Sequence, residues 1–420
     1  MIFSRRSSNP GATKAPAGSV APAAVPGVMG AAGRYGFEYL PAKEVYLDSA
    51  CQTLRPQPVI DSLTDYYHNY NACGERAKYA WGLKVDERVA AVRAKVLAAF
   101  GLPAAEYSVS FTLNTTYGLN LLLNQLPKRP RIVTTHTEHN SVFLSTMAYA
   151  NRVGAQRILL NRDAAGNVLY TEADLRDAVV VVSAMNNVDG AALANLHALV
   201  ADTHRAGGIV IIDAAQAAPH AMSMLHGLKA DAICFSAHKI YGASLGVIVA
   251  RNELVLSLVL TFVGGGQVSA VRENSYDLLP EPHALLEPGL QAWGEIIALG
   301  AALDYLAGYE KAVGESLEAR EHRLSTNLYN GIAATGKFQI LSKPGSSLIT
   351  VVPKGGDGHR FAVFLSKANV MVRSGHFCAH HWLEEQLKLP PLVRFSLGAH
   401  NNDSDIAQAV EMVTRLSKTL

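Results

Sequence analysis

Short runs of apolar residues recur along the first three quarters of the chain and predict buried β-strands. The runs lie at residues 108–112, 131–135, 178–183, 208–213, 231–236 and 245–250. Helical segments separate most of them, and one at residues 86–100 places Val89, Val92, Val96 and Phe100 on one face before Gly101. Near-continuous apolar strands between helices are typical of an α/β fold with a mostly parallel sheet that is covered on both faces.

After about residue 310 the pattern changes. A charged helix at 315–332 is followed by short strands at 338–341, 347–352, 370–373 and 394–397. Ile406, Val410, Val413 and Leu416 mark a closing amphipathic helix. A chain of 420 residues that is 49% hydrophobic is long enough for two domains. We therefore expect a large domain at 56–310 and a smaller C-terminal α+β domain at 311–420.

Charge and cysteine content exclude several classes of function. The 37 basic and 35 acidic residues are well mixed and give a net charge of +2, so nothing favours nucleic acid as a partner. The longest apolar runs, such as residues 254–263, are shorter than the ~20 residues of a membrane span. The four cysteines have no paired spacing, which indicates a reducing, cytoplasmic compartment.

Residues 1–36 differ from the rest of the chain. They are rich in Ala, Pro and Gly, and no acidic residue occurs before Glu38. Too few apolar side chains are present to offset the entropy of ordering, so we predict a disordered tail. Either a targeting segment or a docking segment would have this composition, and the sequence does not choose between them.

A lysine and an aspartate follow neighbouring predicted strands. Ser236, His238 and Lys239 come directly after one strand, and Asp213 ends the strand before it, with Gln216 three residues further on. Lysine can bond covalently to an aldehyde, and a carboxylate can keep a pyridine nitrogen protonated. Pyridoxal phosphate requires both groups, whereas a surface lysine and a strand-end aspartate are each common alone. The order and spacing of the two motifs favour the cofactor.

A phosphate site is predicted where a helix begins. Asn114, Thr115 and Thr116 follow the strand at 108–112 and open an apolar helix. Free backbone N–H groups and the helix dipole favour an anion there, and Thr115 and Thr116 add hydroxyl donors. Ser236 and His238 would reach the same phosphate from the lysine strand. The alternative is ordinary capping of the helix by Asn or Thr.

Cys378 is predicted to lie on a loop, because it follows the short apolar strand that begins at residue 370. His376, His380, His381 and Arg373 surround it in the sequence, and such positive surroundings favour the reactive thiolate. One alternative is an inert buried cysteine. Another is a zinc-type site, but no second cysteine lies nearby and structural sites usually have four ligands, so we expect no metal.

Arg394 is the candidate for binding a substrate carboxylate. A planar guanidinium can donate two parallel hydrogen bonds to the α-carboxylate of an amino acid, which fixes its orientation. The alternative is a surface salt bridge.

Together these motifs resemble the class V aminotransferase superfamily and, within it, the group II cysteine desulfurases and selenocysteine lyases. The resemblance covers about nine-tenths of the chain, from Tyr46 to the last helix. It implies pyridoxal phosphate and the type I fold of enzymes that use it, with residues 37–55 joining the small domain and two subunits pairing as a homodimer. It also implies that His139 stacks on the cofactor ring, that Asn187 contacts the phenolic oxygen and the substrate carboxylate, and that Gln216 is a second donor to that oxygen.

The activity implied is conversion of L-cysteine to L-alanine, with the sulfur transferred to Cys378 as a persulfide and then to an acceptor protein of unknown identity. A selenocysteine lyase would use nearly the same residues, whereas another class V lyase or aminotransferase would not need Cys378. A non-catalytic scaffold in sulfur trafficking is a further alternative. The chain departs from the family pattern in two places: His380, His381 and Trp382 replace a proline-containing turn, and Leu290 replaces a threonine that reaches the neighbouring subunit's phosphate.

Overall fold

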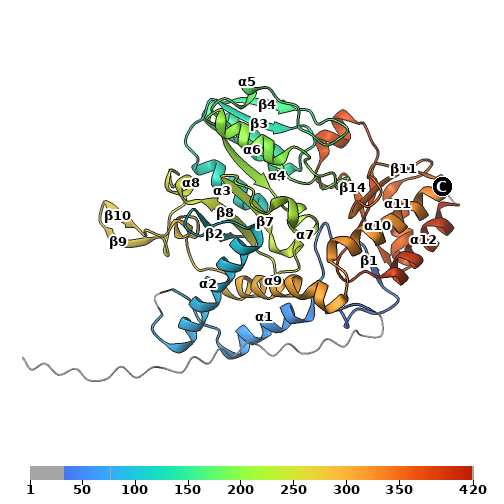
Figure 1. Cartoon of the computed structure of the whole chain (residues 1–420), viewed down its shortest axis with the longest axis horizontal. Coiled ribbons are helices and arrows are strands. Elements are labelled where there is room, and N and C mark those ends of the chain that lie inside the picture. The colour runs from blue at the N-terminus through green and yellow to red at the C-terminus, as the bar shows by residue number, and fades with distance from the viewer. Residues whose placement is uncertain (1–32, 76, 419–420) are drawn as a thin grey trace, which may run out of the picture.

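The structure is a computed structural model that describes residues 33–418 except residue 76. Its central sheet has seven strands in the order β2-β8-β7-β6-β5-β3-β4 (Figure 1). All neighbouring strands are parallel except at β8, which runs antiparallel to β2 and β7. The strands are β2 (Tyr107–Thr112), β3 (Arg131–Thr135), β4 (Gln156–Leu160), β5 (Ala178–Ser183), β6 (Ile209–Asp213), β7 (Ala232–Ser236) and β8 (Gly246–Arg251). The predicted mostly parallel α/β sheet is confirmed.

Alternate residues of the strands point into two separate cores, so both faces of the sheet are buried. Val180 and Val182 of β5 belong to one core, and Val179 and Val181 belong to the other. The first core is completed by α2 (Ala80–Phe100), α6 (Leu196–Arg205) and α9 (Trp293–Val313), with α1 (Gln57–Asn69) against α9. The second is completed by α3 (Thr115–Gln125), α4 (Asn140–Val153) and α8 (Asn252–Leu256).

Helix α2 begins six residues earlier than the pattern predicted. Trp81 and Leu83 are exposed at its start, 53% each, and these apolar residues on the solvent side hide the helical periodicity. Short helices complete this part of the chain: α5 (Glu172–Leu175), α7 (Ala217–His220), η1 (Met222–Leu225), η2 (Ala237–Lys239) and η3 (Pro282–Leu286).

The C-terminal part forms an antiparallel sheet in the order β11-β12-β15-β14, with its own apolar core. Its strands are β11 (Phe338–Ile340), β12 (Leu348–Pro353), β14 (Arg373–Gly375) and β15 (Leu392–Ser396), and its helices are α10 (Leu317–Ala334), α11 (Gly358–Lys367) and α12 (Asp403–Ser417). The single strand predicted at 370–373 is wrong. The chain changes partner at Val372, so that β13 (Val370–Met371) pairs in parallel with β1 (Val45–Tyr46) and β14 pairs with β15.

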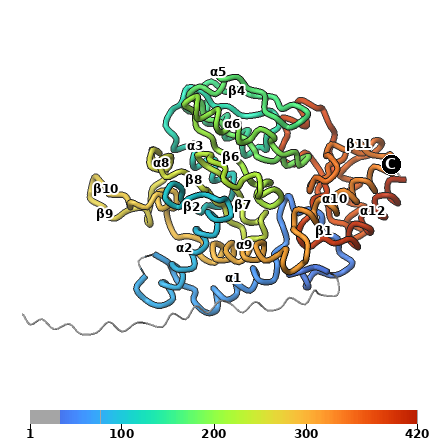
Figure 2. The backbone as a smooth tube through the Cα atoms, viewed as in Figure 1, coloured from blue at the N-terminus to red at the C-terminus, as the bar shows by residue number. Residues whose placement is uncertain are grey.

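The N-terminal segment therefore lies against the C-terminal sheet, as the tube in Figure 2 shows. Part of the predicted tail belongs to this ordered region. Arg34 is 2% exposed and its Nη2 lies 2.5 Å from Asp405 Oδ1, and the Tyr35 ring stacks on Tyr305 with centroids 5.3 Å apart. The predicted end of the disordered tail at residue 36 is thus wrong. A buried ion pair and a ring contact hold residues 34 and 35 in place, although the sequence there contains no apolar run. The tail prediction now concerns residues 1–32, which lie outside the described residues.

Replacing Arg34 with alanine should lower the free energy of unfolding by about 3–5 kcal/mol, because it leaves the buried Asp405 carboxylate without its partner. Arg176→Ala is the control, since Arg176 and Glu172 form an exposed pair 3.9 Å apart that should contribute less than about 1 kcal/mol. Urea unfolding followed by circular dichroism measures both. Equal losses in the two variants would contradict the importance of the buried pair.

Within the described part of the chain, every helix is too short or too polar to span a bilayer.

Candidate active site

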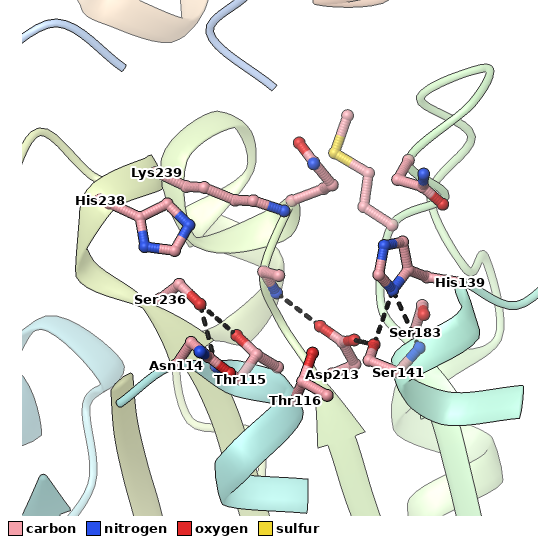
Figure 3. Close-up of a pocket in the computed structure, with 14 residues that line it drawn as sticks. Asn114, Thr115, Thr116, His139, Ser141, Ser183, Asp213, Ser236, His238 and Lys239 are labelled. Carbon is pink, nitrogen blue, oxygen red and sulfur yellow. Dashed lines mark hydrogen bonds between the residues drawn. The ribbon is translucent and has the colours of Figure 1, made fainter. Parts of the chain in front are cut away.

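A cavity of about 460 Å³ lies where β5, β6 and β7 end and α3 and α4 begin (Figure 3). This volume is within the range of about 300–1,000 Å³ that is usual for small-molecule sites. Nine of the eleven residues predicted for the site line it: Thr115, Thr116, His139, Asn187, Asp213, Gln216, Ser236, His238 and Lys239. Arg394 and Cys378 are not part of the lining, but both connect to it through the loop described below.

Lys239 and Asp213 supply opposite charges to this cavity. Asp213, at the end of β6, is 5% exposed and accepts hydrogen bonds from Ser141 Oγ at 3.0 Å and Ala215 N at 2.9 Å (Figure 3). Burial raises the pKa of Asp213, while these hydrogen bonds and Lys239 act in the opposite direction. Burial lowers the pKa of Lys239, and Asp213 partly offsets this. The neutral fraction of the Lys239 amine is therefore increased. The buried carboxylate of Asp213 is suited to a cationic ring nitrogen.

The start of α3 has both a helix cap and hydroxyl groups at the cavity. Asn114 Oδ1 caps the helix by accepting from Tyr117 N at 2.9 Å. Thr115 N donates to Ser236 Oγ at 2.9 Å, and the hydroxyls of Thr115 and Ser236 lie 2.7 Å apart at the cavity. Burial lowers the pKa of His238 to about 4, so this ring is neutral near pH 7. Capping and a row of hydroxyl donors therefore occur together.

His139 precedes α4, and its Nδ1 accepts a hydrogen bond from Ser141 N at 3.0 Å. Burial, followed by the charges of Lys239 and Arg394, lowers the pKa of His139 to about 3. A neutral imidazole can stack on a cationic ring without charge repulsion. Ser141 thus connects His139 with Asp213, a role that sequence reasoning missed because a serine in the first turn of a helix carries no chemical signal.

Asn187 and Gln216 line the cavity, and the side-chain nitrogen of each donates to a backbone carbonyl. Asn187 Nδ2 donates to Phe377 O at 2.7 Å, and Gln216 Nε2 donates to Ala50 O at 2.8 Å. Each amide nitrogen has a second hydrogen. Gln216 Oε1 is buried and has no hydrogen-bond partner among the described residues, although Gln216 lines the cavity. Such an orphaned polar atom fits a cavity that takes a polar ligand.

Arg394 is 4% exposed, so the alternative of a surface salt bridge is wrong. Its Nη1 donates to Asn187 O at 2.7 Å, its Nη2 lies 3.7 Å from Asp48 Oδ1, and its guanidinium lies 4.7 Å from the Phe377 ring centroid. Burial lowers the pKa of Arg394 to about 10. Its Nε has no partner among the described residues, so this N–H group is available to donate to an anion. The sequence argument did not include Asp48.

Cys378 is exposed on a loop beside the cavity, so the alternative of an inert buried cysteine is wrong. Backbone angles φ of +49° at Phe377 and +57° at Cys378 place two consecutive non-glycine residues in the left-handed region. Asn140 N holds Cys378 O at 2.6 Å, just as Asn187 holds Phe377 O. The loop is therefore fixed to the rim of the cavity through two of its carbonyl groups.

Two neighbours of this loop change its electrostatic surroundings. Arg373, which the sequence counts toward a positive setting for Cys378, pairs with Asp48 at 2.9 Å and also contacts Cys51 Sγ. Cys51 is therefore a second thiol near the site, and all four cysteines of the chain are free. After Cys378, the segment η4 (His381–Gln386) has π-helical geometry where the family pattern has a proline-containing turn.

Known proteins are similar to this chain in sequence and in fold. The sequence model described as "Aminotransferase class-V" matches residues 45–409. A "Probable cysteine desulfurase" of Chlamydia muridarum is 30% identical over 380 residues, which cover 87% of this chain and 93% of that protein. The solved structure of the Escherichia coli cysteine desulfurase CsdA, in its S-sulfonic acid form, has a TM-score of 0.81 and 26% identity, and covers 92% of this chain and 98% of the other.

The fold is also shared with a C-DES mutant in which glycine is covalently linked to the PLP cofactor, with a TM-score of 0.72, 18% identity, and coverage of 89% and 97% of the two chains. The chain belongs to the class V aminotransferase family. Pyridoxal phosphate is the cofactor of this family, and the amine, the buried carboxylate and the hydroxyl groups around the cavity fit it.

Proposed function

We propose that this protein is a cysteine desulfurase that converts L-cysteine to L-alanine and leaves the sulfur on Cys378 as a persulfide. The observation that carries the proposal is the loop of Cys378, whose backbone is hydrogen-bonded to Asn187 at the rim of the cavity that contains Lys239 and Asp213. A thiol held there can meet the sulfur of an amino acid whose Cα lies near Lys239. The names of the relatives support the same activity.

Pyridoxal phosphate, when bound, withdraws electrons from the Cα of an attached amino acid. Asp213 keeps the proton on the ring nitrogen, because a buried carboxylate attracts the nearest cation strongly. Lys239 would hold the cofactor through its aldehyde, and its amine is the group placed to accept the Cα proton of the substrate. Its lowered pKa favours the neutral amine that this step needs.

Arg394 binds the substrate carboxylate, for which its unpartnered Nε and its buried position are suited. The thiolate of Cys378 then attacks the substrate sulfur. A sulfur–sulfur bond forms, the carbon–sulfur bond breaks, and its electron pair remains on the carbon side. Protonation of that carbon and return of a proton to Cα from Lys239 complete alanine, and Cys378 retains the sulfur as a persulfide.

The exposed position of Cys378 supports onward transfer of this sulfur to an acceptor protein. Selenocysteine would be accepted by the same groups, because only the chalcogen atom differs. Four free cysteines support the cytoplasm as the location of the protein.

The wild-type protein should bind pyridoxal phosphate and become yellow, and borohydride should fix the cofactor to Lys239. Incubated with L-cysteine, it should form one alanine for each sulfur atom released or retained as persulfide. Absorbance, mass spectrometry of the labelled peptide and alanine quantification measure these results. A colourless protein after incubation with excess pyridoxal phosphate would refute the enzyme proposal, and turnover absent with cysteine, selenocysteine and cystine would favour the scaffold alternative.

We also propose that the protein is a homodimer. Apolar side chains are exposed along residues 259–290: Val259 62%, Phe262 53%, Val263 48%, Val271 71% and Leu290 77%. The hairpin β9 (Val268–Arg272) and β10 (Ser275–Leu278) projects from the body in this region (Figure 1). A set of exposed apolar residues this close in sequence is more typical of an interface than of a free surface.

Val271→Glu should therefore shift the protein toward monomers, because it would bury a charge in the interface. Light scattering after size-exclusion chromatography measures the mass. Val363→Glu is the control, since Val363 is 53% exposed on α11, away from the hairpin. A wild-type protein that is monomeric at micromolar concentration would contradict the proposal.

A further inference from the structure

Three potential metal ligands lie together beside Cys378. The ligand atoms of His376, His380 and Glu384 are all within 4.8 Å of one another, and the two imidazole centroids are 6.0 Å apart. The sequence motif around Cys378 indicates only histidine and cysteine as ligands. The π-helical geometry of η4 brings Glu384 to this group as a third ligand.

The contacts of His376 direct one of its ring nitrogens at Glu384. His376 Nε2 lies 3.1 Å from Leu389 O, and a carbonyl oxygen only accepts, so Nε2 is the donor. The other nitrogen, Nδ1, lies 2.7 Å from Glu384 Oε1. A nitrogen and a carboxylate oxygen that face each other are joined by a proton, and a metal ion can replace that proton once the two atoms move apart to ligand spacing.

Second contacts hold both imidazoles in place, as is usual for metal ligands. The carbonyl of Leu389 orients His376. Asn140 Nδ2 lies 3.0 Å from His380 Nδ1 and donates to it, and the backbone N–H of Asn140 also holds Cys378 O. Exchange of the amide oxygen and nitrogen of Asn140 would let the oxygen accept from Nδ1–H of His380 and leave Nε2 of His380 for a metal.

The spacing suits a small tetrahedral ion. Bonds of about 2.0–2.1 Å to nitrogen and oxygen place tetrahedral ligand atoms about 3.3 Å apart. The distances here range from 2.7 Å for the closest pair to at most 4.8 Å, so small rotations of the side chains reach that geometry. His380 and Glu384 are exposed, which gives an ion access from solvent.

We propose that His376, His380 and Glu384 form a binding site for a divalent ion of the zinc type. Two imidazoles and a carboxylate are a ligand set that zinc accepts, and three protein ligands leave a fourth position open. The ion would join His376, two positions before Cys378, to His380 and Glu384, which follow Cys378 by two and six positions. It would therefore restrain the loop that carries the thiol. The site itself does not depend on the proposed reaction.

The test is calorimetric titration of the metal-free holoenzyme with zinc chloride, in buffer without cysteine. Wild-type protein should bind one zinc ion per chain at this site. Glu384→Gln and His380→Asn should each weaken that binding about 10-fold or more, and Glu385→Gln, a neighbouring exposed carboxylate, is the matched control that should leave it unchanged. Retained pyridoxal phosphate absorbance shows that each variant is folded.

Cobalt chloride provides a second readout, because visible absorption bands of a tetrahedral ion should appear in wild-type protein and be lost in Glu384→Gln. Two results would overturn the proposal. The first is no zinc binding by wild-type protein, which would mean that His376 and Glu384 form only a hydrogen bond with each other. The second is equal binding by wild-type protein and Glu384→Gln, which would place zinc elsewhere, for instance on free thiols.

Discussion

Replacing Lys239 with alanine is expected to reduce alanine formation from L-cysteine by at least about 10²–10⁴-fold, the usual contribution of a positioned acid or base. The loss should be larger if the covalent hold on the cofactor also matters for binding. Lys239 is the lysine that lines the cavity, and its lowered pKa depends on the buried position that alanine would vacate. The variant should also lack the cofactor that borohydride fixes to the wild-type chain.

Lys229→Ala is the control, because Lys229 is exposed in the segment before β7, away from the cavity. It should retain cofactor and activity. Steady-state alanine formation and mass spectrometry of the reduced protein measure both effects. If Lys239→Ala still holds pyridoxal phosphate in a borohydride-stable bond and turns over normally, another lysine has this role and the assignment is wrong.

The strands of the central sheet were predictable because most of them are buried on both faces. The strands at 131–135 and 178–183 agree with their predicted bounds, since each is rich in the β-branched residues that favour strands. Strand β4 was missed because it is the edge strand, and only Leu160 within it is fully buried. The hairpin β9–β10 was missed because its strands are short and its residues are mostly exposed, so no apolar run marks them.

Site residues that belong to local motifs could also be predicted. Lys239, Asp213 and Thr115 follow strands that meet at one edge of the sheet, so their convergence follows from the parallel topology. Residues that approach from distant parts of the chain could not be predicted. Asp48 reaches Arg394 only because β1 pairs with β13 and Asp48 forms a bridge with Ser396 of β15, and Glu384 reaches His376 only through the shape of η4.

The roles assigned to Asn187 and Gln216 show a related limit. The resemblance predicts that both amides contact the cofactor. Both residues line the cavity, and their side-chain nitrogens also donate to Phe377 O and Ala50 O, which the resemblance did not indicate. Asn187 thereby holds the Cys378 loop, so its link to the thiol is more direct than the motif indicated. Contact of Asn187 with the cofactor remains a prediction.

Cys378→Ala should separate the desulfurase proposal from the other class V activities. The variant should keep the cofactor, because Cys378 does not line the cavity that the cofactor would occupy. It should lose persulfide formation completely and alanine formation by about 10²-fold or more, since no thiol at that position remains to attack the substrate sulfur. A lyase or aminotransferase of the same fold would not need this thiol.

Cys73→Ala is the matched control, because Cys73 is also an exposed free thiol but lies between α1 and α2. It should behave as wild type in absorbance, alanine formation and labelling of the persulfide by an alkylating reagent. Cys51 provides an internal check, since it contacts Arg373 near the site. If Cys378→Ala releases alanine and sulfide at the wild-type rate, with no label on Cys51, carbon–sulfur cleavage needs no thiol and the protein is a lyase. A label that moves to Cys51 would instead mean that the second thiol accepts the sulfur.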